Sequence, residues 1–100
     1  MRHLLFDLTD GSDDILTLEA MASTRETEHA AVMAEVEQVL GWAQAEFGGR
    51  RGPVEDGNAW DHELLIQHEM GEWITVTLTL SASPEFVEAF QAAFGEIDED

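Results

Sequence analysis

The sequence predicts an α+β fold in which a four-stranded, mainly antiparallel sheet carries two helices packed on one face. Three observations lead to this class: two pairs of alternating apolar runs, two segments with apolar residues at helical spacing, and their order along the chain, ββαββα. Placing both helices on the same side of the sheet is the simplest way to bury the apolar face of each element. We expect one domain over residues 1–97, followed by an acidic tail at 98–100.

Two alternating runs near the N-terminus predict the first hairpin. Every second residue of 4–8 and of 16–20 is apolar, so these side chains share one face if the two runs pair. The polar residues between the runs contain an Asp-Gly step, which is typical of a turn. The apolar set is Leu4, Phe6, Leu8, Leu16, Leu18 and Ala20.

A long helix is expected next. Ser23 and Glu26 have the spacing of a capping box, which predicts that the helix begins there. It continues to Phe47, and Gly48-Gly49 predicts its C-terminal cap. Its apolar stripe contains Val32, Val36, Val39, Leu40, Ala43 and Phe47.

The second hairpin is the clearest element of the sequence. Residues 50–58 are rich in Gly, Pro and charge and predict a loop, after which alternating runs at 60–68 and 73–80 predict two strands. A three-residue connection, Met70-Gly71-Glu72, places Leu64 and Ile66 on the core face. Their partners on that face are Ile74, Val76, Leu78 and Leu80.

The last element is a second helix. Ser83-Pro84 predicts its start, with Pro at the first helical position. Its apolar stripe is expected to contain Phe86, Phe90, Ala93, Phe94 and Ile97.

Charge and composition exclude several classes of function. The 100 residues contain 4 Arg, no Lys and 22 acidic residues, for a formal net charge of −18. Direct binding to nucleic acid or to an anionic membrane is not expected, because phosphate binding depends on Lys and Arg. No apolar run approaches the roughly 20 residues of a membrane span. Asp7 interrupts the short apolar run that precedes it, so we expect no signal peptide and a cytoplasmic protein.

The sequence offers little catalytic chemistry. Without Cys, Lys or Tyr there is no thiol nucleophile, Schiff-base lysine or tyrosine acid, and no GxSxG, HExxH, GxGxxG or P-loop motif occurs. His62 and His68 would share a strand face, but roughly 20 Å of strand separates their backbones, too far for one zinc ion. We therefore expect no catalytic residue, no cofactor and no metal site.

Three further features have ordinary structural explanations. His29 falls within the helical stripe, where a partly buried, hydrogen-bonded histidine is expected. Residues Asp7–Asp14 concentrate oxygen ligands but lack the EF-hand pattern, so a solvated turn is favoured over a calcium site. Arg50-Arg51 follow a helix C-terminus, where they complement the helix dipole; anion docking by this loop is the alternative.

Two surfaces are candidates for contact with another molecule. On the first helix, the side away from the apolar stripe carries small residues, and Gly41 would be explained by the close approach of another element. On the sheet, the face away from the helices combines threonines with large apolar residues, as in many interfaces. The candidate contact residues are Leu5, Met21, Leu65, Trp73, Thr75 and Thr77 on the sheet and Ala34 and Gly41 on the helix.

Three hypotheses for function remain. The first is a small acidic, non-catalytic module that binds another protein or a second copy of itself through one of these surfaces. The second is a nucleic-acid mimic that occupies the basic groove of a DNA-binding protein. The third is an enzyme using His62 with Asp61 or Glu63, which requires a pocket lined by histidine and carboxylate groups.

Overall fold

The computed structural model describes residues 3–11 and 14–95. It confirms the α+β class and the ββαββα order. The elements are β1 (Phe6–Asp10), β2 (Leu16–Arg25), α1 (His29–Phe47), β3 (Trp60–His68), β4 (Trp73–Ala82) and α2 (Pro84–Phe94), with 3₁₀ turns at Glu26–Glu28, Gly48–Arg50 and Val54–Asp56. Within these ranges no helix is long and apolar enough to cross a membrane.

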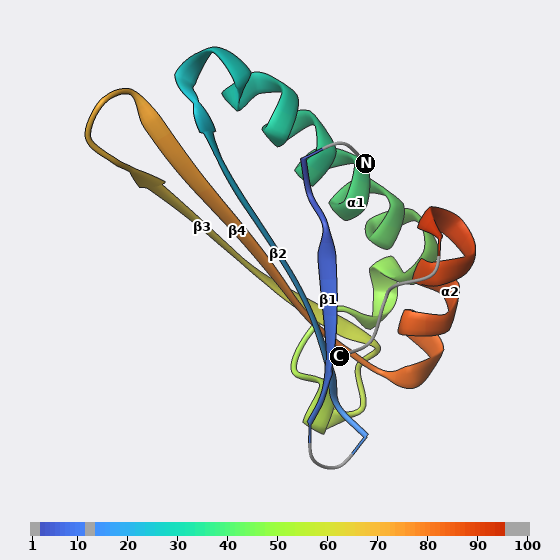
Figure 1. Ribbon diagram of the computed structural model, residues 1–100. Helices are drawn as coiled ribbons and strands as arrows, with labels where there is room; N and C mark the ends of the chain where they lie inside the picture. The colour runs from blue at the N-terminus through green and yellow to red at the C-terminus, as the bar shows by residue number, and fades with distance from the viewer. Residues whose placement is uncertain (1–2, 12–13, 96–100) are drawn as a thin grey trace.

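The four strands form one antiparallel sheet in the order β1-β2-β4-β3 (Figure 1). The last strand of the chain, β4, therefore lies between β2 and β3. Because both neighbours run antiparallel to β4, β2 and β3 are parallel to each other without touching. The helix α1 connects these two strands, so the crossover passes over β4, and β1 and β3 are the edges of the sheet.

The strand registers confirm the expected faces. Phe6 pairs with Ala20 and Leu8 with Leu18 in the first hairpin. In the second hairpin Leu64 pairs with Leu78 and Ile66 with Val76, as the three-residue connection requires. Even-numbered strand residues consequently face the helices, and odd-numbered ones face away from them.

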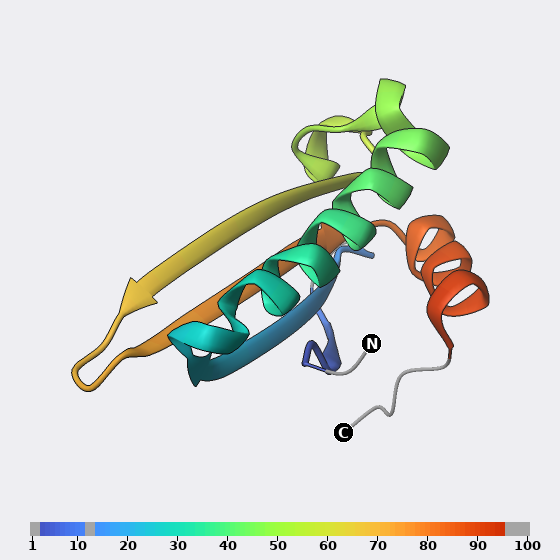
Figure 2. The ribbon, with the colours of Figure 1, turned by 90° about the horizontal axis from the view of Figure 1, so that it is seen from above.

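Both helices cover the same face of the sheet (Figures 1 and 2). The α1 stripe is confirmed, since Val32, Val36, Val39 and Ala43 are buried. Trp42 joins the two helices, with ring centroids 5.3–5.9 Å from Phe86, Phe90 and Phe94. The other fully buried large side chains include Trp60, Leu4, Leu18, Leu78, Leu80 and Val76.

The far end of the second hairpin extends beyond this helical cover. In Figure 2, β3 curves away from α1 toward the hairpin turn. Ile66 faces the helix side yet is 39% exposed, and Leu64 is only partly buried, whereas their partners Val76 and Leu78 are fully buried. The core face of β3 is therefore covered near Trp60 and left open near His68.

The predicted start of the first helix is wrong. Ser23 to Arg25 continue β2, opposite Thr75 to Trp73 of β4, and α1 begins at His29 after a 3₁₀ turn without a side-chain cap. A capping box is a local signal, and here the hydrogen bonds available along β4 extend the strand instead.

Two details at the helix ends also differ from expectation. Gly48 has φ −59°, an ordinary helical value, so the chain passes into a 3₁₀ turn rather than a left-handed cap. On α2 the buried positions are Phe86, Val87 and Phe90, while Ala93 is exposed, and Ile97 lies outside the described residues. The start of α2 is confirmed, with Pro84 first and the Ser83 hydroxyl accepting a bond from Phe86 N–H at 3.2 Å.

Candidate functional site

An apolar row crosses the open face of the sheet. The registers place Met21 opposite Thr77 and Thr77 opposite Leu65. Leu5 lies one residue before β1, where the pairing of Phe6 with Ala20 places it beside Met21. Leu5 is 75%, Met21 65% and Leu65 50% exposed. We call these four residues, including the half-buried Thr77, the apolar row.

An acidic row lies beside the apolar row on the same face. Asp7 is directly opposite Glu19, which pairs with Thr79, which in turn pairs with Glu63. Like charges directly opposite each other on neighbouring strands destabilise a sheet. In the described part of the chain none of these three exposed carboxylates has an Arg or His partner. The face therefore combines an apolar stripe with uncompensated negative charge.

Near the hairpin turn, Trp73 forms the end of this face. It is partly exposed, and the guanidinium of Arg25 lies over its ring, 5.6 Å from the centroid. Thr75 corrects the sequence-based expectation, because only 8% of it is exposed. Its hydroxyl donates to Glu69 Oε1 at 3.1 Å and hydrogen-bonds with the Ser23 hydroxyl, so it serves the sheet rather than a partner.

The small-residue side of α1 is exposed, and no described segment of the chain packs against it at Gly41. Ala34 and Gly41 both face solvent. A Cβ added to Gly41 would meet no atom within 4 Å among the described residues, so the close approach that would explain this glycine is absent within the chain. A row of small residues alone gives no reason to choose this side of the helix.

The edge strand β3 provides a feature that sequence analysis missed. Glu69 N–H donates to the Trp73 carbonyl at 2.7 Å. Because hydrogen-bonded pairs recur at every second residue of an antiparallel ladder, the backbone N–H and C=O groups of odd-numbered β3 residues point toward β4. Even-numbered residues direct theirs outward. The Trp60 carbonyl accepts from Gly52 N–H at 2.9 Å, and His62 N–H donates to Asp61 Oδ1 at 2.9 Å. Beyond His62, no described strand pairs with the outward groups of Leu64, Ile66 and His68.

The sequence does contain one signal for this bare edge. Residues 64–67 of β3 carry no charge, although charged side chains are a common means of protecting an edge strand. The opposite edge, β1, has only five residues and includes Asp7 and Asp10. What the sequence did not indicate was that β3, rather than another strand, lies at an edge.

The described histidines and arginines lie apart or pair with carboxylates. The pKa of His62 is lowered by burial and by the nearby Arg51 guanidinium, with Asp61 acting in the opposite direction. Arg50 pairs with Glu85 at 2.8 Å and Arg51 with Asp61 at 3.7 Å. Both arginines of this loop therefore have a carboxylate neighbour. No group of three potential metal ligands occurs among the described residues.

A groove of about 460 Å³ lies between the first hairpin and α2. Its polar side chains are Asp10, Glu88 and Gln91, and its lining contains no histidine. It does not include His62, so it is not the histidine and carboxylate pocket that the enzyme hypothesis requires. Ser12 and Asp13, from the turn considered for calcium, lie outside the described residues.

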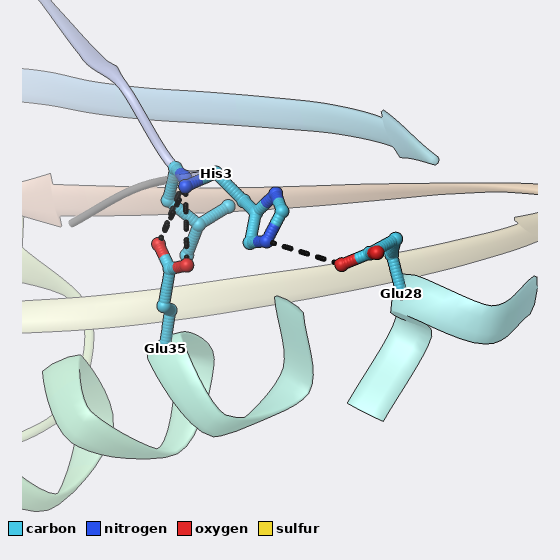
Figure 3. A network of polar contacts seen from close by, with 4 residues as sticks. His3, Glu28 and Glu35 are labelled. Atoms are coloured by element: carbon cyan, nitrogen blue, oxygen red, sulfur yellow. Dashed lines mark hydrogen bonds and ion pairs between the residues drawn. The ribbon is translucent and has the colours of Figure 1, made fainter. Parts of the chain in front are cut away.

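A polar network holds the N-terminal segment against α1 (Figure 3). The Glu35 carboxylate accepts hydrogen bonds from His3 N–H and Leu4 N–H, each at 3.0 Å to Oε1. His3 Nε2 lies 3.8 Å from Glu28 Oε2, a pair that is ionic only when the imidazole is protonated. These contacts position the start of β1, and with it Leu5 of the apolar row.

The fold defines the chain as an α+β protein and the surface defines a candidate interaction site. Comparison with known protein families, curated proteins and solved structures gives no match. A function is therefore proposed from the geometry of the chain alone.

Proposed function

We propose that this protein is a small acidic, non-catalytic module that binds another protein through the open face of its sheet. The observation that carries the proposal is the apolar row, which exposes Leu5, Met21 and Leu65 on the face without helices. Large apolar side chains grouped on one face are typical of protein interaction sites, whereas single exposed ones are common everywhere.

The charge around the row supports a protein partner with a basic surface. The acidic row places Asp7 and Glu19 side by side, and no Arg or His among the described residues pairs with either of them. A basic partner would relieve this repulsion and would be attracted from a distance by the net charge of −18. The apolar row would then supply the desolvated centre of the interface and the carboxylates its polar rim.

A second copy of the chain is another way to cover the open face. It would bury two apolar rows at once, but it would also bring two acidic rows together. The nucleic-acid mimic differs from both, because its binding would depend on the carboxylates and be largely indifferent to the apolar row. Sensitivity to salt and to apolar substitution therefore separates the three arrangements.

The test is affinity capture from the source organism at low and moderate salt, with two variants of equal charge. Met21→Glu adds a carboxylate to the sheet face, and Ala34→Glu adds one to the exposed side of α1. We expect Met21→Glu to lose the partner identified by mass spectrometry and Ala34→Glu to retain it. If both variants retain every partner, the sheet-face proposal is wrong.

A further inference from the structure

We propose that the partner inserts an extended, basic segment along β3, which joins the sheet as a fifth strand. This inference rests on the proposed binding function and specifies where and how the partner is held. Strand addition to a sheet edge is a recurrent mode of recognition, in which backbone hydrogen bonds provide affinity and alternate side chains provide specificity.

The backbone of β3 is protected over one half and bare over the other. Near its start, the Trp60 carbonyl accepts a hydrogen bond from Gly52 N–H, and the His62 N–H donates one to the Asp61 carboxylate. Beyond that point the outward N–H and C=O groups of Leu64, Ile66 and His68 face away from β4 with no described strand beside them. The bare half therefore offers three consecutive outward-facing residues, enough for a short strand to pair.

The side chains of the bare half suit burial on both faces of the sheet. Leu65 belongs to the apolar row, while Ile66 faces the helix side and is 39% exposed, with the partly buried Leu64 beside it. An added strand with alternating residues would cover Leu65 with one set of side chains and Ile66 with the other.

Charge selects a basic occupant. On the open face, Glu63 and Glu69 lie at the two ends of the bare half, and neither pairs with an Arg or His in the described chain. Lys or Arg directly opposite these positions would form favourable cross-strand pairs. The expected segment therefore has apolar residues facing the helix side and basic residues at each end of the open-face set.

A second copy of the chain fits this edge poorly. Two identical antiparallel strands pair about a central residue. Only a pairing centred on Ile66 matches the three free residues with one another, and it places Glu63 opposite Glu69 of the other copy twice. A pairing centred on Leu65 places Asp61 opposite Glu69 of the other copy. It also requires the His62 N–H to give up its hydrogen bond to the Asp61 carboxylate. A centre at Leu64 brings His68 against Trp60, whose carbonyl is already occupied.

The experiment titrates isotope-labelled protein with the blocked peptide Ac-Lys-Val-Thr-Val-Thr-Val-Lys-NH₂, followed by NMR. Its lysines align with Glu63 and Glu69, and its valines align with Leu64, Ile66 and His68. We expect saturable binding, shifts at these three amides, and slower hydrogen exchange at them. Shifts at Glu19 and Met21 without protection of the β3 amides would overturn strand addition and leave the proposed function intact, as would a complete lack of binding.

Matched peptides test the hydrogen bonds themselves. N-methylation of the two valines opposite Leu64 and Ile66 removes donors directed at β3, and N-methylation of the two threonines adds the same groups on the opposite edge. We expect the first peptide to bind about tenfold more weakly or worse, and the second to bind like the parent, because each net hydrogen bond contributes a factor of roughly two to ten. Equal binding by both would contradict the proposal.

Two further measurements separate charge and self-association. A peptide with Glu in place of both Lys residues should not bind, and binding equal to the parent would overturn the basic specificity. Concentration-dependent dimerisation of the protein alone, with protection of the same three amides, would assign the edge to a second copy and overturn the proposal.

A protein variant completes the test. Ile66→Pro removes an outward N–H that β4 does not use, and edge strands tolerate Pro at such positions. We expect it to remain folded by circular dichroism and to lose the parent peptide. Should it unfold, the N-methylated peptides still decide the question with the wild-type chain; a folded variant that binds normally would contradict strand addition.

Discussion

At the scale of single residues, the surroundings of His62 disfavour its charged form and lower its pKa. Its ring stacks on Trp60 with centroids 5.9 Å apart, and its buried Nδ1 has no hydrogen-bond partner among residues 3–11 and 14–95. Burial, then the Arg51 charge, lower its pKa from 6.5, against the opposing effect of Asp61. The folded chain therefore binds a proton at His62 less readily than the unfolded chain.

This difference predicts a loss of stability on acidification. As the pH falls, the unfolded state binds a proton at His62 before the folded state does. The contribution of neutral His62 to the free energy of unfolding is therefore complete above pH 6.5 and is lost as the pH falls through the lowered pKa of the folded state. We expect urea denaturation between about pH 7.5 and about pH 5.5 to show a larger loss for wild type than for His62→Gln. His68→Gln, at an exposed position of the same strand, should behave like wild type. An NMR titration that places the His62 pKa at or above 6.5 would contradict this.

Alternation along the strands was sufficient to place most residues of the open face. Leu5, Met21, Leu65 and Trp73 follow the period of two and are exposed where a partner could reach them. Thr75 follows the same period yet is buried, because Ser23 and Glu69 from two other segments enclose its hydroxyl. Contacts of this kind join residues distant in sequence and leave no local pattern.

At the scale of elements, the types of helix and strand were predictable and one boundary was not. The Ser23 to Glu26 spacing is a valid local signal, but strand pairing with β4 continues to Arg25. The edge position of β3 was also not predictable from local sequence. It follows from the strand order β1-β2-β4-β3, which the alternation of apolar residues does not determine. Local periodicity identifies elements, while their neighbours depend on the whole sheet.

The Glu35 contact between α1 and the N-terminal segment can be tested directly. Glu35→Ala removes the acceptor for His3 N–H and Leu4 N–H, and Leu4 is buried. We expect a loss of about 1–3 kcal/mol in the free energy of unfolding, measured by urea denaturation. Glu37→Ala removes the same charge from an exposed position of α1 and should have little effect. Equal losses in the two variants would show that the Glu35 bonds contribute nothing specific.

At the scale of the whole molecule, repulsion among carboxylates opposes the compact state. The net charge is −18, and the described chain contains only two Arg–carboxylate pairs. The extents of 42 × 27 × 24 Å reflect an elongated shape with a protruding second hairpin. Exposed carboxylates in so small a volume lie within each other's electrostatic range at low ionic strength.

Salt should therefore stabilise the protein. We expect the thermal unfolding midpoint to rise as sodium chloride increases from about 0.01 M to about 0.15 M, because the screening length shortens from roughly 30 Å to roughly 8 Å. Potassium chloride should act equally, since screening does not depend on the cation. A midpoint that falls with salt would mean that favourable ion pairs outweigh repulsion.

The central position of β4 determines when the chain can acquire its native structure. During synthesis, a nascent chain that ends before Trp73 holds one complete strand pair, β1 with β2, and leaves β3 without a neighbour. Contacts such as Leu18 with Leu80 join positions far apart in the polypeptide, and such separations slow folding. Cooperative folding therefore waits until β4 has emerged from the ribosome, and until then the apolar residues of β2 and β3 lack their central partner strand and are exposed to aggregation.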